Sequence, residues 1–118
     1  MTAYALAHLF NPNPHPEVIE YIERIQATLE PYGGAFIAHG PTVDVKEGEW
    51  PGTVVVVEFR ELDRANAWYD SPAYREILPL RADNIAGNTI IFDGVGPDYD
   101  ARHTAAALRA MAARLPTD

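Results

Sequence analysis

Four consecutive valines occupy residues 54–57 and are followed by Glu58 and Phe59. A run of β-branched residues predicts a strand, which we place at residues 53–60. A strand with one face in water normally alternates apolar and polar side chains. This strand does not alternate over its valines, and the apolar run at residues 90–92 does not alternate either. Both faces of the sheet are therefore expected to be covered.

The remaining elements follow from apolar periodicity and from the Gly and Pro residues that bound it. Three further strands are predicted at residues 3–10, 35–45 and 88–94, and the second of these is expected to break at Gly40-Pro41. Helices are predicted at residues 16–32, 62–69, 73–85 and 98–115. Pro79 lies inside the third helix and is expected to kink it or to end it near Leu78. The order β-α-β-β-α-β, followed by one added helix, predicts an α+β, ferredoxin-like domain with an antiparallel four-stranded sheet.

The helices of such a domain cover one face of its sheet and leave the other face open. Either the C-terminal helix or the sheet of a second copy must cover the open face. We expect a face-to-face homodimer around a two-fold axis. A monomer whose last helix caps the open face is the alternative. The predicted division is a domain at residues 1–97 and a C-terminal helical extension at residues 98–118.

Charge and composition exclude several kinds of partner and chemistry. The 118 residues carry 9 Lys and Arg against 17 Asp and Glu, a net charge of −8. We therefore expect neither nucleic acid nor a membrane surface as a partner. The absence of cysteine excludes thiol nucleophiles and thiolate metal sites. The four histidines are scattered and no phosphate-binding glycine loop occurs, so no metal and no cofactor is expected. No targeting or membrane-spanning pattern is recognisable, which favours a cytoplasmic location.

Two residues are the main candidates for catalysis. His39 lies near the end of the second predicted strand, and an imidazole can take or give a proton near neutral pH. The alternative is a structural histidine that is hydrogen-bonded at a strand end. Arg81 ends the third predicted helix, and its guanidinium can hold a carboxylate or enolate bidentately. The alternative is an ion pair with Glu76, Asp83 or Glu58.

Aromatic residues surround a predicted break between two helices. Tyr69 and Tyr74 flank this break, and a phenol can donate to a developing oxyanion. Core packing with the hydroxyl at the rim is the alternative. Ser71 is expected to cap the following helix, and it joins Trp68 and Tyr74 as a candidate substrate-binding residue. Trp68 is also expected to pack in the core.

Glu58 interrupts an otherwise apolar strand, as Asp93 does in the last strand. Facing a closed interior, such a carboxylate would have a perturbed pKa and could act as a base. A water-exposed strand edge is the alternative. The catalytic candidates are therefore His39, Tyr69, Arg81 and Glu58.

Several short motifs resemble those of domain of unknown function family 1330, a group in the dimeric α+β barrel superfamily. They are Gly33-Gly34, Ala38-His39-Gly40, Glu47-Gly48, Val57-Glu58-Phe59 and the stretch Trp68-Tyr69-Asp70-Ser71-Pro72-Ala73-Tyr74 with Leu80-Arg81 beyond it. The last is the most specific. The resemblance runs from about Tyr4 to Val95. It implies a ferredoxin-like dimer with a small-molecule pocket between sheet and helices.

The chain departs from the family pattern in two places. The family usually has Arg followed by Gly-Gly where this chain has His39-Gly40-Pro41. An anion-binding guanidinium is thus replaced by a titratable imidazole. The helical tail after Pro97 also lies outside the resemblance.

We therefore predict a homodimer that binds a small organic molecule. The leading hypothesis is a cofactor-independent enzyme of the cyclase or isomerase kind. His39 or a buried carboxylate would move a proton, while Arg81 and a tyrosine would hold an oxyanion. A non-catalytic binder of a small organic acid and a structural or assembly protein are the alternatives.

Overall fold

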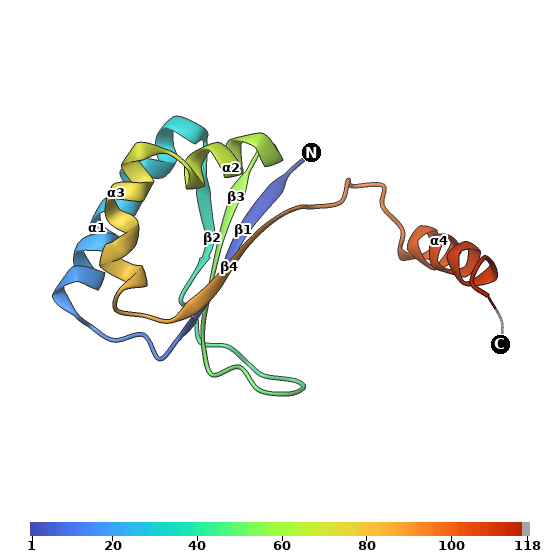
Figure 1. The fold of residues 1–118 in the computed structure, drawn as a ribbon, viewed down its shortest axis with the longest axis horizontal. Helices are drawn as coiled ribbons and strands as arrows, with labels where there is room; N and C mark the ends of the chain where they lie inside the picture. Colours follow the sequence, from blue (N-terminus) through green and yellow to red (C-terminus); the bar gives the residue numbers. More distant parts are fainter. Residues whose placement is uncertain (117–118) are drawn as a thin grey trace.

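The computed structural model describes residues 1–116 and has helices packed on one face of a sheet (Figure 1). The strands are β1 (Ala3–Phe10), β2 (Ala35–His39), β3 (Gly52–Phe59) and β4 (Gly87–Asp93). The helices are α1 (Pro16–Leu29), the 3-10 helix η1 (Glu30–Tyr32), α2 (Leu62–Tyr69), α3 (Pro72–Ala82) and α4 (Ala101–Ala113). The sheet is antiparallel with the order β2-β3-β1-β4. The predicted ferredoxin-like βαββαβ fold with an added C-terminal helix is confirmed.

The register of the central strand β1 divides the sheet into two faces. Ala5 lies opposite Val57 of β3, and both are buried beneath the helices. One residue further along, Leu6 lies between Val56 of β3 and Ile90 of β4. Since successive side chains of a strand point to opposite faces, these three form an apolar rung on the face without helices.

The core fills the space between the covered face and helices α1, α2 and α3. Val18, Tyr21, Ile25 and Leu29 recur at spacings of three and four, so they share one side of α1 and are all buried. Ile22, which apolar spacing alone also places on this side of α1, is 47% exposed.

A local cap explains where α3 begins, and packing explains why the helix continues through its proline. The Ser71 hydroxyl accepts a hydrogen bond from the Tyr74 amide at 3.2 Å and donates one to the Trp68 carbonyl at 2.7 Å, as expected of a cap. Of the two alternatives expected at Pro79, a kink or an end near Leu78, the end is wrong, because the helix continues through Pro79 to Ala82. Proline removes one amide donor, and the buried side chains on both sides of it keep the helix against the core.

The second strand ends at the break expected at Gly40-Pro41. It stops at His39 and does not resume before residue 45, because Gly40 has a φ of 64° and Pro41 follows it. A left-handed φ is readily adopted by glycine and turns the chain out of the sheet. The Gly40 amide still donates to the Val54 carbonyl at 2.9 Å. The strand pairs antiparallel with β3.

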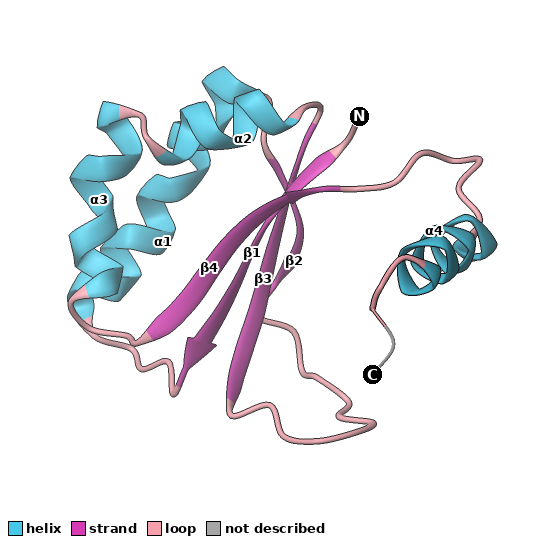
Figure 2. Cartoon of the chain, turned by 45° about the vertical axis from the view of Figure 1, so that its right-hand side comes forward, coloured by secondary structure: helices cyan, strands magenta, loops and turns pink. Residues whose placement is uncertain are grey.

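Helix α4 stands apart from the sheet, on the side away from α1 and α3 (Figure 2). Every residue of it is exposed, so it does not cap the open face, which was the alternative to a dimer. The radius of gyration is 17.8 Å, against about 13–14 Å for a compact domain of this length. The predicted extension at 98–118 includes two residues outside the described part, and the division at residue 97 stays a prediction. Within residues 1–116, no helix is long and apolar enough to cross a membrane.

Candidate functional site

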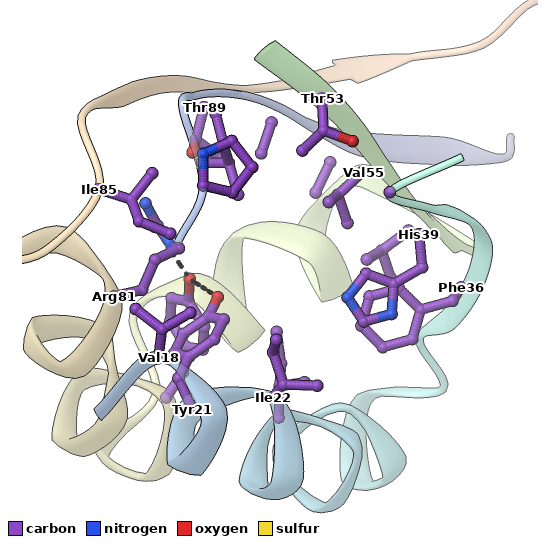
Figure 3. Close-up of a pocket in the computed structure, with 18 of the residues that line it drawn as sticks. Val18, Tyr21, Ile22, Phe36, His39, Thr53, Val55, Arg81, Ile85 and Thr89 are labelled. Carbon is purple, nitrogen blue, oxygen red and sulfur yellow. Dashed lines mark hydrogen bonds between the residues drawn. The ribbon is translucent and has the colours of Figure 1, made fainter. Parts of the chain in front are cut away.

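A cavity of about 410 Å³ lies between the covered sheet face and the helices (Figure 3). Its volume is in the range of small-molecule pockets. Most of its wall is aliphatic. The aliphatic lining residues are Ala5, Ala7, Leu9, Pro12, Val18, Ile22, Ile25, Val55, Val57 and Ile85. Such walls favour an apolar ligand body.

One side of the cavity carries a cluster of polar groups from two helices. The hydroxyl oxygens of Tyr21 on α1 and Tyr74 on α3 are hydrogen-bonded at 2.8 Å. Arg81 lies seven residues beyond Tyr74 on α3, and its Nη2 donates to the Tyr74 oxygen at 3.5 Å. Its guanidinium carbon also lies 5.5 Å from the centre of the Tyr21 ring. All three side chains line the cavity, and we call them the oxyanion cluster.

Arg81 is a nearly buried cation, with an exposure of 8%. Buried charges are normally paired, because desolvation costs several kcal/mol per ion. The ion pair expected as the alternative is not formed in residues 1–116, and Glu76 instead pairs with Arg24 at 3.3 Å. Within the described residues, the polar side-chain groups beside this positive charge are the neutral hydroxyls of Tyr21 and Tyr74.

The electrostatics of the cluster keep its groups in defined states. Burial raises the pKa of Tyr21, and the neighbouring Tyr74 raises it further, so the phenol stays protonated and can donate. Burial alone would lower the pKa of Arg81. The adjacent Tyr21 and Tyr74 oxygens outweigh that effect, and the pKa of the guanidinium is raised. One hydroxyl of the pair donates to the other, so the cluster offers a fixed cation and one phenol donor to an anionic oxygen.

His39 reaches the cavity because of an irregularity in β2. Phe36 pairs with Val57 and His39 with Val55, both on the covered face, and Ile37 is the extra residue between them. This β-bulge changes the alternation so that His39 faces the helices. Its ring stacks on Phe36 with 4.5 Å between centroids and 6° between planes. His39 lies across the cavity from Arg81 (Figure 3).

The predicted aromatic residues divide into two groups. Trp68 and Tyr74 line the cavity, with 4.2 Å between their ring centroids. The Trp68 indole donates to Thr28 Oγ1 at 3.0 Å, which also satisfies the predicted core role. Tyr69 does not line the cavity, and its ring instead lies 4.7 Å from the Arg75 guanidinium carbon. Ser71 is buried as a helix cap and does not line the cavity either.

Glu58 is separated from the cavity by the sheet. It lies opposite Tyr4 of β1 and Ala35 of β2, on the face without helices. The alternation of β3 causes this, since Val57 and Phe59 on either side are buried in the core. The structure therefore groups His39, Arg81, Trp68 and Tyr74 at one cavity, apart from the remaining three candidates.

Tyr21 is the site residue that the sequence reasoning missed. Its spacing of three from Val18 and four from Ile25 indicates a place on the buried stripe, and that signal was available. Its meeting with Tyr74, 53 residues away, has no local signal. Within residues 1–116 there is no group of three or more His, Cys, Asp or Glu side chains suited to hold a metal ion.

Residues 2–95 match the family described as a domain of unknown function, DUF1330. The chain belongs to the DUF1330 family. The match covers the sheet and the three packed helices of this DUF1330 protein and ends before α4. The family resemblance expected from the short motifs is thereby confirmed. No curated protein matches the chain.

Solved structures share the fold of this DUF1330 protein. RPA0582, a Rhodopseudomonas palustris protein of unknown function, has a TM-score of 0.62 and 16% identity over 81% of this chain and 84% of that one. A Mesorhizobium loti dabb family protein with a ferredoxin-like fold has a TM-score of 0.55 and 12% identity, with 80% and 98% covered. SnoaB, a cofactor-independent oxygenase from Streptomyces nogalater, has a TM-score of 0.51 and 13% identity, with 84% and 96% covered. Likeness at these identities shows the fold alone.

Proposed function

We propose that this protein binds a small, largely apolar organic acid in the cavity, with its anionic oxygen at the oxyanion cluster. One observation carries the proposal: Arg81 is 8% exposed, lines the cavity and has no carboxylate partner within residues 1–116. A carboxylate or enolate would supply the missing negative charge and could accept from both the guanidinium and a phenol.

The second part of the proposal is a proton transfer by His39. Among the cavity-lining side chains of the described residues, His39 is the one whose type takes or gives a proton near neutral pH. It lies across the cavity from Arg81, so a molecule held at the oxyanion cluster would extend towards it. The imidazole would remove a proton from a carbon beside a carbonyl and return it at another carbon. Such an isomerase or cyclase step needs no oxidant and no cofactor.

A non-catalytic binder of the same acids is the second candidate. The observation in its favour is that no side chain in residues 1–116 hydrogen-bonds to the His39 imidazole, which is held by stacking on Phe36. General bases are usually oriented by a second polar group. A binder without chemistry would need only the oxyanion cluster and the aliphatic walls.

Thermal unfolding with a matched pair of probes tests the binding proposal. The acid 4-phenylbutanoate and its neutral amide, 4-phenylbutanamide, differ mainly in charge. Since a ligand stabilises the folded state that binds it, the acid should raise the unfolding midpoint and the amide should do so much less. Equal shifts for both compounds, or none for either, would count against the proposal.

Deuterium exchange separates the enzyme from the binder. The probe is 4-phenyl-2-oxobutanoate, an apolar keto acid with an acidic C–H beside its carbonyl. The proposed enzyme should speed its exchange in D₂O, followed by proton NMR, and His39→Gln should abolish the acceleration. His103→Gln on α4 is the matched control. Binding of the keto acid without any acceleration would favour the binder.

We also propose a homodimer formed through the open face of the sheet. Leu6, Val56 and Ile90 form an apolar rung there, and Ile90 is 55% exposed. Exposed apolar patches of this kind on a sheet commonly mark an interface. A two-fold pairing of identical faces would bury the rung of both copies. A cytoplasmic location stays a prediction.

A further inference from the structure

Helix α4 packs against no other helix or strand within residues 1–116. All of its 13 residues are exposed, and both views place it away from the sheet and the other helices (Figures 1 and 2). An isolated helix of this length is marginal in water, because most helices gain their stability by packing an apolar side. A formed but unpacked helix therefore calls for a surface outside its own chain.

The sequence of α4 provides the side that would pack. Ala105, Leu108 and Ala112 recur at spacings of three and four, and Leu115 continues the stripe beyond the helix. Leu108 is 57% exposed, the adjacent Met111 54% and Leu115 62%. Most of this apolar stripe is therefore exposed to water. Its burial against another surface would be favourable.

Charge indicates what kind of surface the helix fits. Residues 1–100 hold 6 Lys and Arg against 16 Asp and Glu, a net charge of −10. Residues 101–116 hold three Arg and no acidic residue. Arg102 pairs with Asp100 beside it, which leaves Arg109 and Arg114 available. The helix is basic and the body is acidic, so another copy of this body attracts it.

We propose that α4 is an exchanged arm, whose apolar stripe packs on the second copy of the chain. The inference rests on the proposed homodimer through the open sheet face. In both views α4 lies on the open-face side, which is where the second copy would be. Two-fold symmetry makes the exchange reciprocal, so each copy gives one arm and receives one.

A membrane surface is the competing occupant of a basic amphipathic helix. The stripe argues against it, because it consists of alanines with a few Leu and Met side chains and has no aromatic residue. Small side chains instead allow close approach to a protein surface. The body also carries ten net negative charges, which would repel an anionic bilayer.

A paired set of variants in the full chain tests the arm. Leu108→Gln places an amide in the stripe, and Ala110→Gln places the same amide on the opposite side of α4. Sedimentation at a series of concentrations gives the dimer dissociation constant. Leu108→Gln should weaken the dimer at least tenfold, since each dimer loses two buried leucines, and Ala110→Gln should change it less than threefold.

Crosslinking tests directly whether the arm reaches another copy. The chain has no cysteine, so Ala105→Cys and Ala106→Cys each give a single labelling site, on the stripe and on the opposite side. Each variant carries a benzophenone maleimide and is mixed with a tagged chain before irradiation. The stripe label should give hybrid species that contain tagged and untagged chains, and the opposite label should give few.

The outcomes separate the arm from the dimer. A dimer that Leu108→Gln leaves unchanged, without hybrid crosslinks, overturns the arm and retains the dimer. A particle of monomer mass at every concentration overturns both. Binding of α4 to vesicles with 30% phosphatidylserine, lost in Leu108→Gln while the dimer is unchanged, assigns the helix to a membrane and overturns the arm.

Discussion

The hydroxyl oxygens of Tyr21 and Tyr74 lie 2.8 Å apart and join α1 to α3 at the wall of the cavity. Both side chains are buried, with exposures of 8% and 2%. Tyr74 also accepts from Arg81, so the pair connects two helices to the buried cation. The relationship is therefore both a structural link and a part of the proposed ligand site.

Removal of either hydroxyl should reveal how strongly the two tyrosines are coupled. We expect Tyr21→Phe and Tyr74→Phe each to reduce the free energy of unfolding by about 1–2 kcal/mol, since each leaves a buried hydroxyl without its partner. The double variant should lose less than the sum of the two, because it removes both partners together. Urea unfolding of all four proteins gives the coupling energy. Strict additivity would show that the 2.8 Å contact contributes nothing.

Stability should fall at alkaline pH because of Tyr21. Burial raises the pKa of Tyr21 in the folded state, so the folded protein retains a proton that the unfolded chain releases above about pH 10. The stabilisation is complete below that pH and is lost as pH rises through the folded-state pKa. The expected result is a decline in the unfolding midpoint above about pH 10 that is shallower in Tyr21→Phe. Parallel declines in the two proteins would contradict the assignment.

The fold could be predicted because its signals are local. The Val54–Val57 run marks a strand by residue type alone, and the stripe on α1 follows from spacing. The details at the ends of elements also have local causes. Gly40 with its positive φ ends β2 at the expected break, and the packing around Pro79 keeps α3 helical where proline alone favours an end.

The site was predictable only in part, because its geometry depends on register and on contacts between distant elements. Arg81 and His39 were identified by chemistry, but the bulge at Ile37 that turns His39 to the cavity has no sequence signature. Glu58 illustrates the same limit, since a shift of one residue in the register of β3 would move its side chain to the other face of the sheet. Tyr21 became part of the site through a contact with α3.

The proposed dimer should be sensitive to charge on the open sheet face. Val56→Glu places a carboxylate in the Leu6–Val56–Ile90 rung, where a two-fold interface would bury one charge from each copy. We expect the dimer dissociation constant to rise at least a hundredfold, because burial of an unpaired charge costs several kcal/mol. Val45→Glu is the control, since Val45 lies in the loop after β2 and is 47% exposed.

Sedimentation and circular dichroism together decide the outcome for the dimer. Val56→Glu should sediment as a folded monomer, and Val45→Glu should sediment as the wild-type protein does. A Val56→Glu protein that stays dimeric would remove this face from the interface. Circular dichroism checks that each variant retains its helices, so that a loss of mass cannot reflect unfolding.

Titration calorimetry of 4-phenylbutanoate into the wild-type protein, Arg81→Met and Arg75→Met tests the central claim most directly. Methionine replaces the buried cation with an apolar side chain, so stability should change by about 1 kcal/mol or less while acid binding weakens at least tenfold. Arg75 is exposed, pairs with Asp70 and lies outside the cavity, so Arg75→Met should bind the acid like wild type. If Arg81→Met binds the acid as tightly as wild type, Arg81 is not an anion-binding residue and the proposed function fails.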